Sequence, residues 1–102
     1  MIHVIAIITA KPGQREHILE AYRANRPAVL AEDGCIFYEA TVDAAGMPPS
    51  RDAFGDDTFV VIERWENVAA LKAHAASPHM AAYGAKTKEW TASRAIHVLE
   101  AI

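Results

Sequence analysis

Residues 58–83 read T-F-V-V-I-E-R-W-E-N-V-A-A-L-K-A-H-A-A-S-P-H-M-A-A-Y. Strand-forming β-branched and aromatic residues predominate in the first eight positions, which predicts a strand over residues 58–65. This strand runs directly into Asn67, a favourable N-cap residue, so a short helix is expected from there to about Ala75. The strand and the helix would therefore place their side chains around one interior.

The end of this stretch predicts a second helical segment. Ser77 and Pro78 are the residue types favoured at the N-cap and at the first helical position. The helix can continue to about Trp90, and a last strand is expected over residues 94–101. The helical region is thus divided at Ser77.

Upstream of these elements, the sequence predicts another strand and another helix. Residues 2–9 are rich in β-branched side chains and end at the turn signal of residues 11–13. The apolar positions that then recur at helical spacing are Ile18, Tyr22 and Val29. Pro27 lies inside this pattern, which predicts a helix broken into two pieces.

The remaining segment completes the predicted topology. Gly34 ends the helix, residues 35–42 form a strand, and residues 45–57 hold two Gly and two Pro, which indicates a long loop. The resulting order, β-α-β-β-α-β, is typical of the ferredoxin-like split, an α+β fold with four antiparallel strands and the helices on one face. The 102 residues are expected to form a single domain, residues 1–102.

The sheet face without helices is also expected to be buried. Residues 4–8 and 59–62 are apolar throughout, whereas a sheet with one face exposed to solvent would alternate apolar and polar residues. Leaving such side chains in water forgoes on the order of 1 kcal/mol or more each. We therefore expect a second copy to pack its sheet against this one, giving a homodimer, a dimeric α/β barrel. The alternative is a sheet with a few exposed aliphatic residues.

Composition excludes some classes of partner. A net charge of -3 offers no basic surface for nucleic acid. The single cysteine, Cys35, cannot form an internal disulfide, which suits a reducing cytoplasm, and no Cys/His ladder indicates structural zinc. The N-terminal apolar run stops at Thr9, too short for a signal peptide or a membrane span. A cytoplasmic protein with no membrane partner is expected.

Glu63 is the first candidate for chemistry. Strand alternation puts it on one face with Phe59, Val61 and Trp65. A carboxylate in such an apolar row is either paired with a cation, for which His74 or Arg94 is available, or its pKa is raised by desolvation. Only the second case gives a proton acceptor or donor near neutral pH. Both interpretations fit the sequence.

His74 is the first choice for a proton acceptor. It follows Leu71 by one helical turn, so it can reach the space between helix and sheet, and imidazole titrates near pH 7 without perturbation. The alternative is a core histidine whose hydrogen bonds are satisfied. Beyond it, the predicted pocket-lining residues are His79, Met80 and Tyr83, whose spacing is also compatible with core packing.

Metal and nucleotide cofactors are not expected. His74 and His79 are five residues apart, which separates them by about 140° on an unbroken helix. Neither an H-E-x-x-H motif nor a Cys/His cluster accompanies them. A Gly-rich phosphate-binding loop is also absent, so the sequence shows no binding motif for flavin or nicotinamide cofactors.

Four motifs carry a family resemblance that covers nearly the whole chain. They are A-K-P-G at residues 10–13, E-D-G-C at 32–35, I-E-R-W-E at 62–66, and A-H at 73–74 with S-P-H-M at 77–80. With them the chain resembles the antibiotic biosynthesis monooxygenase family, small dimeric ferredoxin-like proteins. The loop after residues 42–45 and the run over 78–83 resemble most closely its bacterial quinol monooxygenase branch. The resemblance implies oxidation of an aromatic substrate by O2 without a cofactor.

Within this resemblance the candidate residues acquire roles. A deprotonated dihydroxyarene can reduce O2 itself, so the protein need only deprotonate it, orient it and exclude water. His74 would be the base or proton shuttle. Glu63 would orient His74 or accept a hydrogen bond from a substrate hydroxyl, and Trp65 would provide a ring-packing wall and an indole donor. The expected substrate is a quinol or hydroquinone.

Other functions stay open at this stage. The haem-degrading branch resembles this chain in its strand-end Trp, but the first strand here lacks the Asn of that branch, and no histidine lies near Gly84, late in the second helical region. A branch that processes a phosphorylated sugar signal resembles the His74 region and would need a basic phosphate site, which Arg26, Arg51 and Arg64 could supply. A non-enzymatic dimeric module that binds a small molecule is a third possibility.

Overall fold

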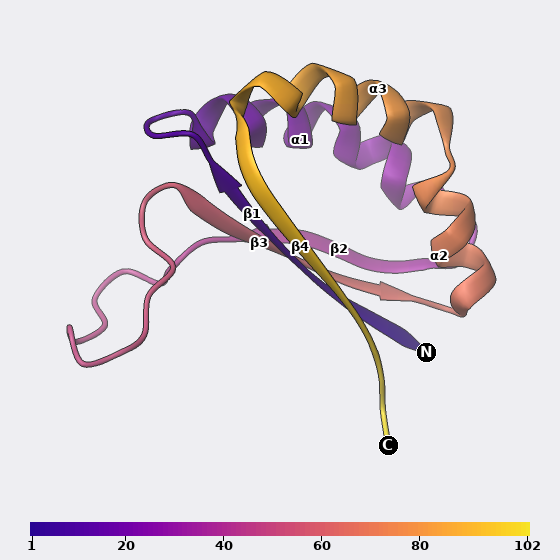
Figure 1. The fold of residues 1–102 in the computed structure, drawn as a ribbon. Coiled ribbons are helices and arrows are strands. Elements are labelled where there is room, and N and C mark those ends of the chain that lie inside the picture. The colour runs from indigo at the N-terminus through magenta and orange to yellow at the C-terminus, as the bar shows by residue number, and fades with distance from the viewer.

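The computed structural model describes all residues, 1–102, and shows a four-stranded antiparallel sheet with the helices on one face (Figure 1). The elements are β1 (Ile2–Ala10), α1 (Arg15–Leu30), β2 (Cys35–Thr41), β3 (Thr58–Trp65), α2 (Val68–Ala75), α3 (Pro78–Thr87), a 3-10 turn η1 (Lys88–Trp90) and β4 (Thr91–Glu100). The strand order is β2-β3-β1-β4. This arrangement confirms the α+β ferredoxin-like split.

The expected break at Pro27 is wrong, because α1 is a single helix that contains Pro27. Proline lacks one N–H, but it lies close to the C-terminal end of α1, so only one hydrogen bond near that end is lost. Two contacts stabilise the last turn of α1. Val29 is fully buried in the core, and the Ala31 amide donates to the Pro27 carbonyl at 3.1 Å.

The last strand begins earlier than residues 94–101 predict. Thr91 already pairs with Ala10, and Ser93 with Thr9, across a register shift that leaves Ala92 of β4 without a partner. Ala92 is a weak strand former, so the local composition does not extend the strand signal back to Thr91. Pairing with β1 overrides that local preference, and β4 starts directly after η1.

The core lies between the sheet and α1. Its largest fully buried side chains are Trp65, Phe59, Ile18, Val4 and Val29. Tyr22 on α1 donates its hydroxyl hydrogen bond to the Tyr38 carbonyl of β2 at 3.1 Å. This bond joins the helix layer to the sheet beside the site described below.

The opposite sheet face has no cover within the chain. Ile5 and Ile62 are direct cross-strand neighbours on it, and both are partly exposed. All the helices lie on the other side of the sheet (Figure 1). The predicted long loop is confirmed, because residues 42–57 contain no helix or strand and project from the sheet (Figure 1).

Candidate active site

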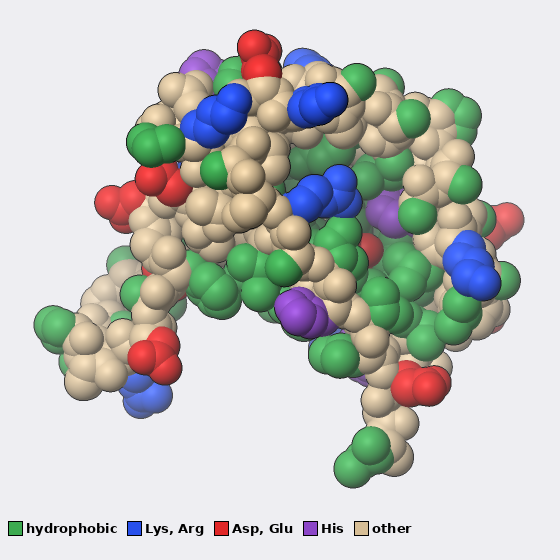
Figure 2. All heavy atoms as spheres, in the orientation of Figure 1, with side chains coloured by type: hydrophobic (Ala, Val, Ile, Leu, Met, Phe, Trp, Pro, Cys, Tyr) green, Lys and Arg blue, Asp and Glu red, His purple; other side chains and the backbone are tan.

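A cavity of about 720 Å³ lies between the sheet and the helices α2 and α3. Its wall is mostly apolar, with Val4, Ala6, Val61 and Ile96 from the strands. Figure 2 shows it as a hollow that opens beside β4, with acidic, basic and imidazole side chains visible inside. A largely apolar cavity with a few polar groups is the usual form of a small-molecule site.

Glu63 enters this cavity from the inner face of β3 and is only 6% exposed. Because side chains two apart on a strand share a face, Trp65 lies beside it, and its indole Nε1 donates to Glu63 Oε1 at 2.9 Å. Burial raises the pKa of the Glu63 carboxyl, and the negative charge of Glu32 acts in the same direction. The Trp65 hydrogen bond and the charge of His74 oppose this shift.

His74 lies in the last turn of α2 and is buried. The position of α2 is fixed at its start, where the Asn67 side chain accepts a hydrogen bond from the Ala70 amide at 2.9 Å, as the sequence predicts. At its end the Ser77 hydroxyl donates to the His74 carbonyl at 2.8 Å. Ser77 thus occupies the predicted N-cap position of α3, but its side chain makes no capping hydrogen bond there.

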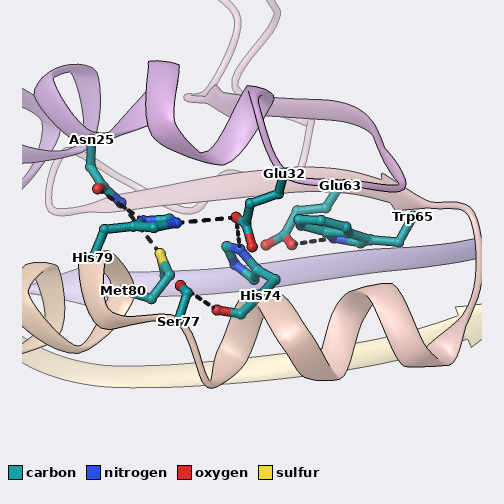
Figure 3. A network of polar contacts seen from close by, with 8 residues as sticks. All are labelled: Asn25, Glu32, Glu63, Trp65, His74, Ser77, His79 and Met80. Atoms are coloured by element: carbon teal, nitrogen blue, oxygen red, sulfur yellow. Dashed lines mark hydrogen bonds and ion pairs between the residues drawn. The ribbon is translucent and has the colours of Figure 1, made fainter.

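Glu32 is the partner of His74, and its Oε2 lies 2.7 Å from His74 Nδ1 (Figure 3). The same oxygen lies 3.4 Å from His79 Nε2, within ion-pair distance but without hydrogen-bond geometry. His79 Nδ1 in turn lies 3.2 Å from the Asn25 amide oxygen. One carboxylate from the turn after α1 therefore holds the imidazole of α2 and faces the imidazole of α3.

Glu32 is a site residue that its sequence pattern does not reveal, although it belongs to the E-D-G-C motif at residues 32–35. An acidic residue beside Asp33 and Gly34 has the composition of an ordinary surface turn. The signal that could have located it is strand pairing. Cys35 pairs with Trp65, so the turn just before β2 lies at the same end of the sheet as the start of α2.

The predicted site residues are only partly brought together. Glu63 and His74 line the cavity, as do Met80 and Tyr83. Burial raises the pKa of the Tyr83 phenol to about 12. Trp65, by contrast, is fully buried behind Glu63, with its ring centroid 4.6 Å from that of His74, so it supports the site and does not wall the cavity.

His79 also differs from its predicted place. It lines a separate small groove between α1 and α3 instead of the main cavity. The reason is that the turn at Ser77 and Pro78 starts a new helix, and the side chain of His79 then points to Asn25 on α1 (Figure 3).

The arginines proposed for a phosphate site lie elsewhere. Arg26 donates to the Tyr38 carbonyl at 2.9 Å, Arg64 covers the Phe37 ring on the outer sheet face, and Arg51 is exposed in the long loop. None of them lines the main cavity. These three arginines therefore form no phosphate site in this cavity. Nor does Glu63 pair with Arg94.

The side chains of His, Cys, Asp and Glu nowhere form a group of three or more that could hold a metal ion. None of the helices combines the length and the apolar character that crossing a membrane requires.

Comparison with known proteins adds the family context. A family model described as antibiotic biosynthesis monooxygenase matches residues 1–86. The chain is 40% identical to an Escherichia coli K12 protein named probable quinol monooxygenase YgiN, over 98% of this chain and 97% of that protein. Among solved structures, PA3566 from Pseudomonas aeruginosa is 27% identical with a TM-score of 0.82, covering 99% and 93% of the two chains. Rv0793 from Mycobacterium tuberculosis is 28% identical with a TM-score of 0.80, covering 99% and 94%.

Proposed function

Since the chain belongs to the antibiotic biosynthesis monooxygenase family, we propose that it oxidises a small aromatic dihydroxy compound, a quinol or hydroquinone, with O2 as the co-substrate. The observation that carries this proposal is the hydrogen bond between His74 and Glu32 at the wall of a mostly apolar cavity that also contains Glu63. The name of the E. coli relative, which contains the words quinol monooxygenase, supports the substrate class.

The reaction balances without an external reductant. A hydroquinone and O2 give a hydroxyquinone and water, because one oxygen atom enters the ring and the other leaves as H2O. The substrate supplies all four electrons, two by oxidation to the quinone level and two by hydroxylation. We therefore propose no cofactor and no metal, and the protein supplies proton transfer, orientation and exclusion of water.

His74 is assigned as the base. A carboxylate only accepts hydrogen bonds, so the imidazole donates to Glu32 from Nδ1 and keeps Nε2 free to accept a proton. Removing a proton from the substrate hydroxyl makes the ring a stronger electron donor toward O2. Glu32 positions the imidazole and stabilises the cation that forms on it.

Glu63 and Trp65 complete the proposed machinery. Because burial favours the neutral form of Glu63, its carboxyl can exchange a hydrogen bond with the second hydroxyl of the substrate. Trp65 fixes the direction of that carboxyl through its indole N–H. Met80 and Tyr83 line the apolar part of the cavity that would receive the ring.

We also propose that the working form is a homodimer joined through the uncovered sheet face. The support is the pair of aliphatic neighbours Ile5 and Ile62 on a face that no helix of the chain covers. Two such faces packed together would remove their apolar side chains from water.

The test is oxygen uptake by the purified protein with a panel of substituted hydroquinones, run with 18O2. We expect one 18O atom in the organic product and no accumulation of H2O2. His74→Ala should lower turnover about a hundredfold or more, because a positioned general base contributes that much. His17→Ala, which removes an exposed histidine of α1, is the matched control and should retain activity.

Two results would overturn the proposal. Saturable binding of hydroquinones without oxygen uptake would indicate a binding module. Oxygen uptake with stoichiometric H2O2 and an unlabelled quinone would indicate an oxidase instead of a monooxygenase. Unchanged turnover in His74→Ala would remove His74 from its role as the base.

A further inference from the structure

Arg94 is the arginine of the cavity wall, and it has no anionic partner. It stands on β4 and lines the cavity together with Glu63 and His74. The three ion pairs of the chain involve Arg23, His74 and His79, and none involves Arg94. Its positive charge acts on the neighbouring Tyr83, where it opposes the rise in the phenol pKa.

The other arginines are occupied or lie outside the body of the protein. They bind backbone carbonyls (Arg15 and Arg26), an acid (Arg23) or an aromatic ring (Arg64), or are exposed in the long loop (Arg51). Arg94 therefore differs in having both a free guanidinium and a place on the wall of the cavity. A guanidinium presents several N–H donors in a planar fork that matches a carboxylate.

Arg94 lies at the opposite end of the cavity from the proton-transfer groups. Across the sheet, Glu63 shares its row with Val4 and Val98, whereas Arg94 pairs with Ile8. The two rows are four residues apart along β4, which is about 13 Å along the strand. Ile96 lies on the row between them, so the middle of the wall is apolar.

The cavity thus has three zones in sequence. Glu63 and His74 form the first, the apolar Ile96 lies in the middle, and the unpaired Arg94 is at the other end. We propose that Arg94 binds a carboxylate carried by the substrate, so that the preferred substrates are hydroquinones with an acidic side chain on the ring. The inference rests on the proposed function and narrows its substrate class. The hydroxyl to be deprotonated would point to His74, while the side chain of the substrate would extend along the apolar middle of the wall and its carboxylate would pair with Arg94.

The charge balance of the cavity supports this orientation. The Glu32 carboxylate lies 2.7 Å from His74, and a substrate carboxylate placed there would meet a like charge. At the other end, Arg94 and Lys88 line the wall and attract an anion. An acidic hydroquinone would thus bind with its carboxylate toward Arg94 and its hydroxyl toward His74.

The experiment compares 2,5-dihydroxyphenylacetate with its methyl ester, titrated into the protein by calorimetry under nitrogen so that no turnover occurs. We expect the wild type to bind the acid roughly 10- to 100-fold more tightly than the ester, the range for a charge-assisted hydrogen-bonded pair. Arg94→Gln should remove this preference, because it should lower the affinity for the acid and leave the affinity for the ester unchanged. Arg94→Lys should keep part of it, because the charge remains while the planar fork is lost.

The controls separate this inference from the proposed function. Lys72→Gln removes the same charge from an exposed position of α2 outside the cavity and should leave the preference unchanged. Thermal unfolding checks that Arg94→Gln is folded. Equal affinities of the wild type for acid and ester, no binding of either, or an equal loss for both in Arg94→Gln would overturn the role of Arg94. A preserved preference without oxygen uptake in air would overturn only the oxygenase reaction.

Discussion

Two carboxyl groups near one imidazole have different environments at this site. Glu32 is hydrogen-bonded directly to His74, whereas Glu63 accepts from the indole of Trp65. Burial shifts the pKa of Glu63 upward. Glu32 is therefore suited to position the imidazole as a carboxylate, whereas the environment of Glu63 favours its neutral form.

Replacement of Glu32 tests its positioning role. Glu32→Ala should lower kcat about tenfold or more with little change in KM, because the imidazole loses the acceptor that fixes its tautomer and direction. Glu32→Gln should recover part of this loss, since an amide oxygen can still accept the Nδ1 hydrogen. Steady-state oxygen uptake measures both parameters. Asp33→Ala, at the exposed neighbouring position, is the control, and an equal loss there would refute the assignment.

The raised pKa of Glu63 predicts a pH-dependent gain in stability for Glu63→Gln. The folded protein holds this proton more tightly than the unfolded chain, so stability falls as pH rises from the ordinary carboxyl pKa through the folded one, and the cost persists above it. The variant should melt a few degrees higher at pH 8, since about 1 kcal/mol moves Tm by roughly 4–8 °C in a domain of this size. Near pH 4 the difference should close.

Thermal unfolding at several pH values measures this effect at one fixed protein concentration. Glu20→Gln, on the exposed side of α1, should show no such trend. A Glu63→Gln variant that is less stable at pH 8, or whose gain is the same at every pH, would contradict the raised pKa.

At the scale of elements, Gly34 sets the distance between the turn that carries Glu32 and the helix that carries His74. Its φ is +81°, and a Cβ added there would lie 2.6 Å from the Cβ of Ala70 on α2. Its carbonyl also accepts the Glu66 amide at 2.8 Å. The close approach of these two segments is what brings the Glu32 carboxylate within reach of the imidazole.

Gly34→Ala should therefore be destabilising for two reasons, backbone strain of about 1–3 kcal/mol and the contact with Ala70. Gly13→Ala is the matched control, because Gly13 has a similar φ of +78° but nothing within 4 Å of an added Cβ. Urea unfolding should show a larger loss for Gly34→Ala than for Gly13→Ala. In a double-mutant cycle Ala70→Gly should recover the difference. Equal losses at the two glycines would show that the contact is unimportant.

Local signals predicted the elements well, and long-range contacts account for what they missed. The strand over residues 58–65 and the cap at Asn67 depend on near neighbours and appear as expected. The bond from Glu32 to His74 spans 42 positions and has no periodic signature. The continuity of α1 through Pro27 depends on the burial of Val29, which the proline pattern does not report.

At the scale of the whole molecule, the uncovered face of the sheet is the main unpaired surface. Ile5 and Ile62 lie in its centre strands, β1 and β3, flanked by β2 and β4. The chain buries only 18 of its 102 residues, so a single copy has a small core. A second copy on this face would enlarge that core across the interface.

Ile62→Asp should convert the proposed dimer to monomers, because it would bury a charge in an apolar interface. Sedimentation equilibrium should give the mass of two chains for the wild type and of one chain for the variant. Val68→Asp provides the control, since Val68 is an exposed aliphatic residue of α2 on the helix side. A monomeric wild type, or dissociation in both variants, would reject the sheet face as the interface.

The hydrogen bond between Trp65 and Glu63 lies within a single strand, whereas the bond between Glu32 and His74 joins a turn to α2. The site consequently has a fixed half and a detachable half. A small shift of α2 away from the sheet would separate His74 from Glu32 and leave the bond between Trp65 and Glu63 in place. In the proposed mechanism such a shift would stop proton transfer, while the cavity wall formed by the sheet stayed unchanged.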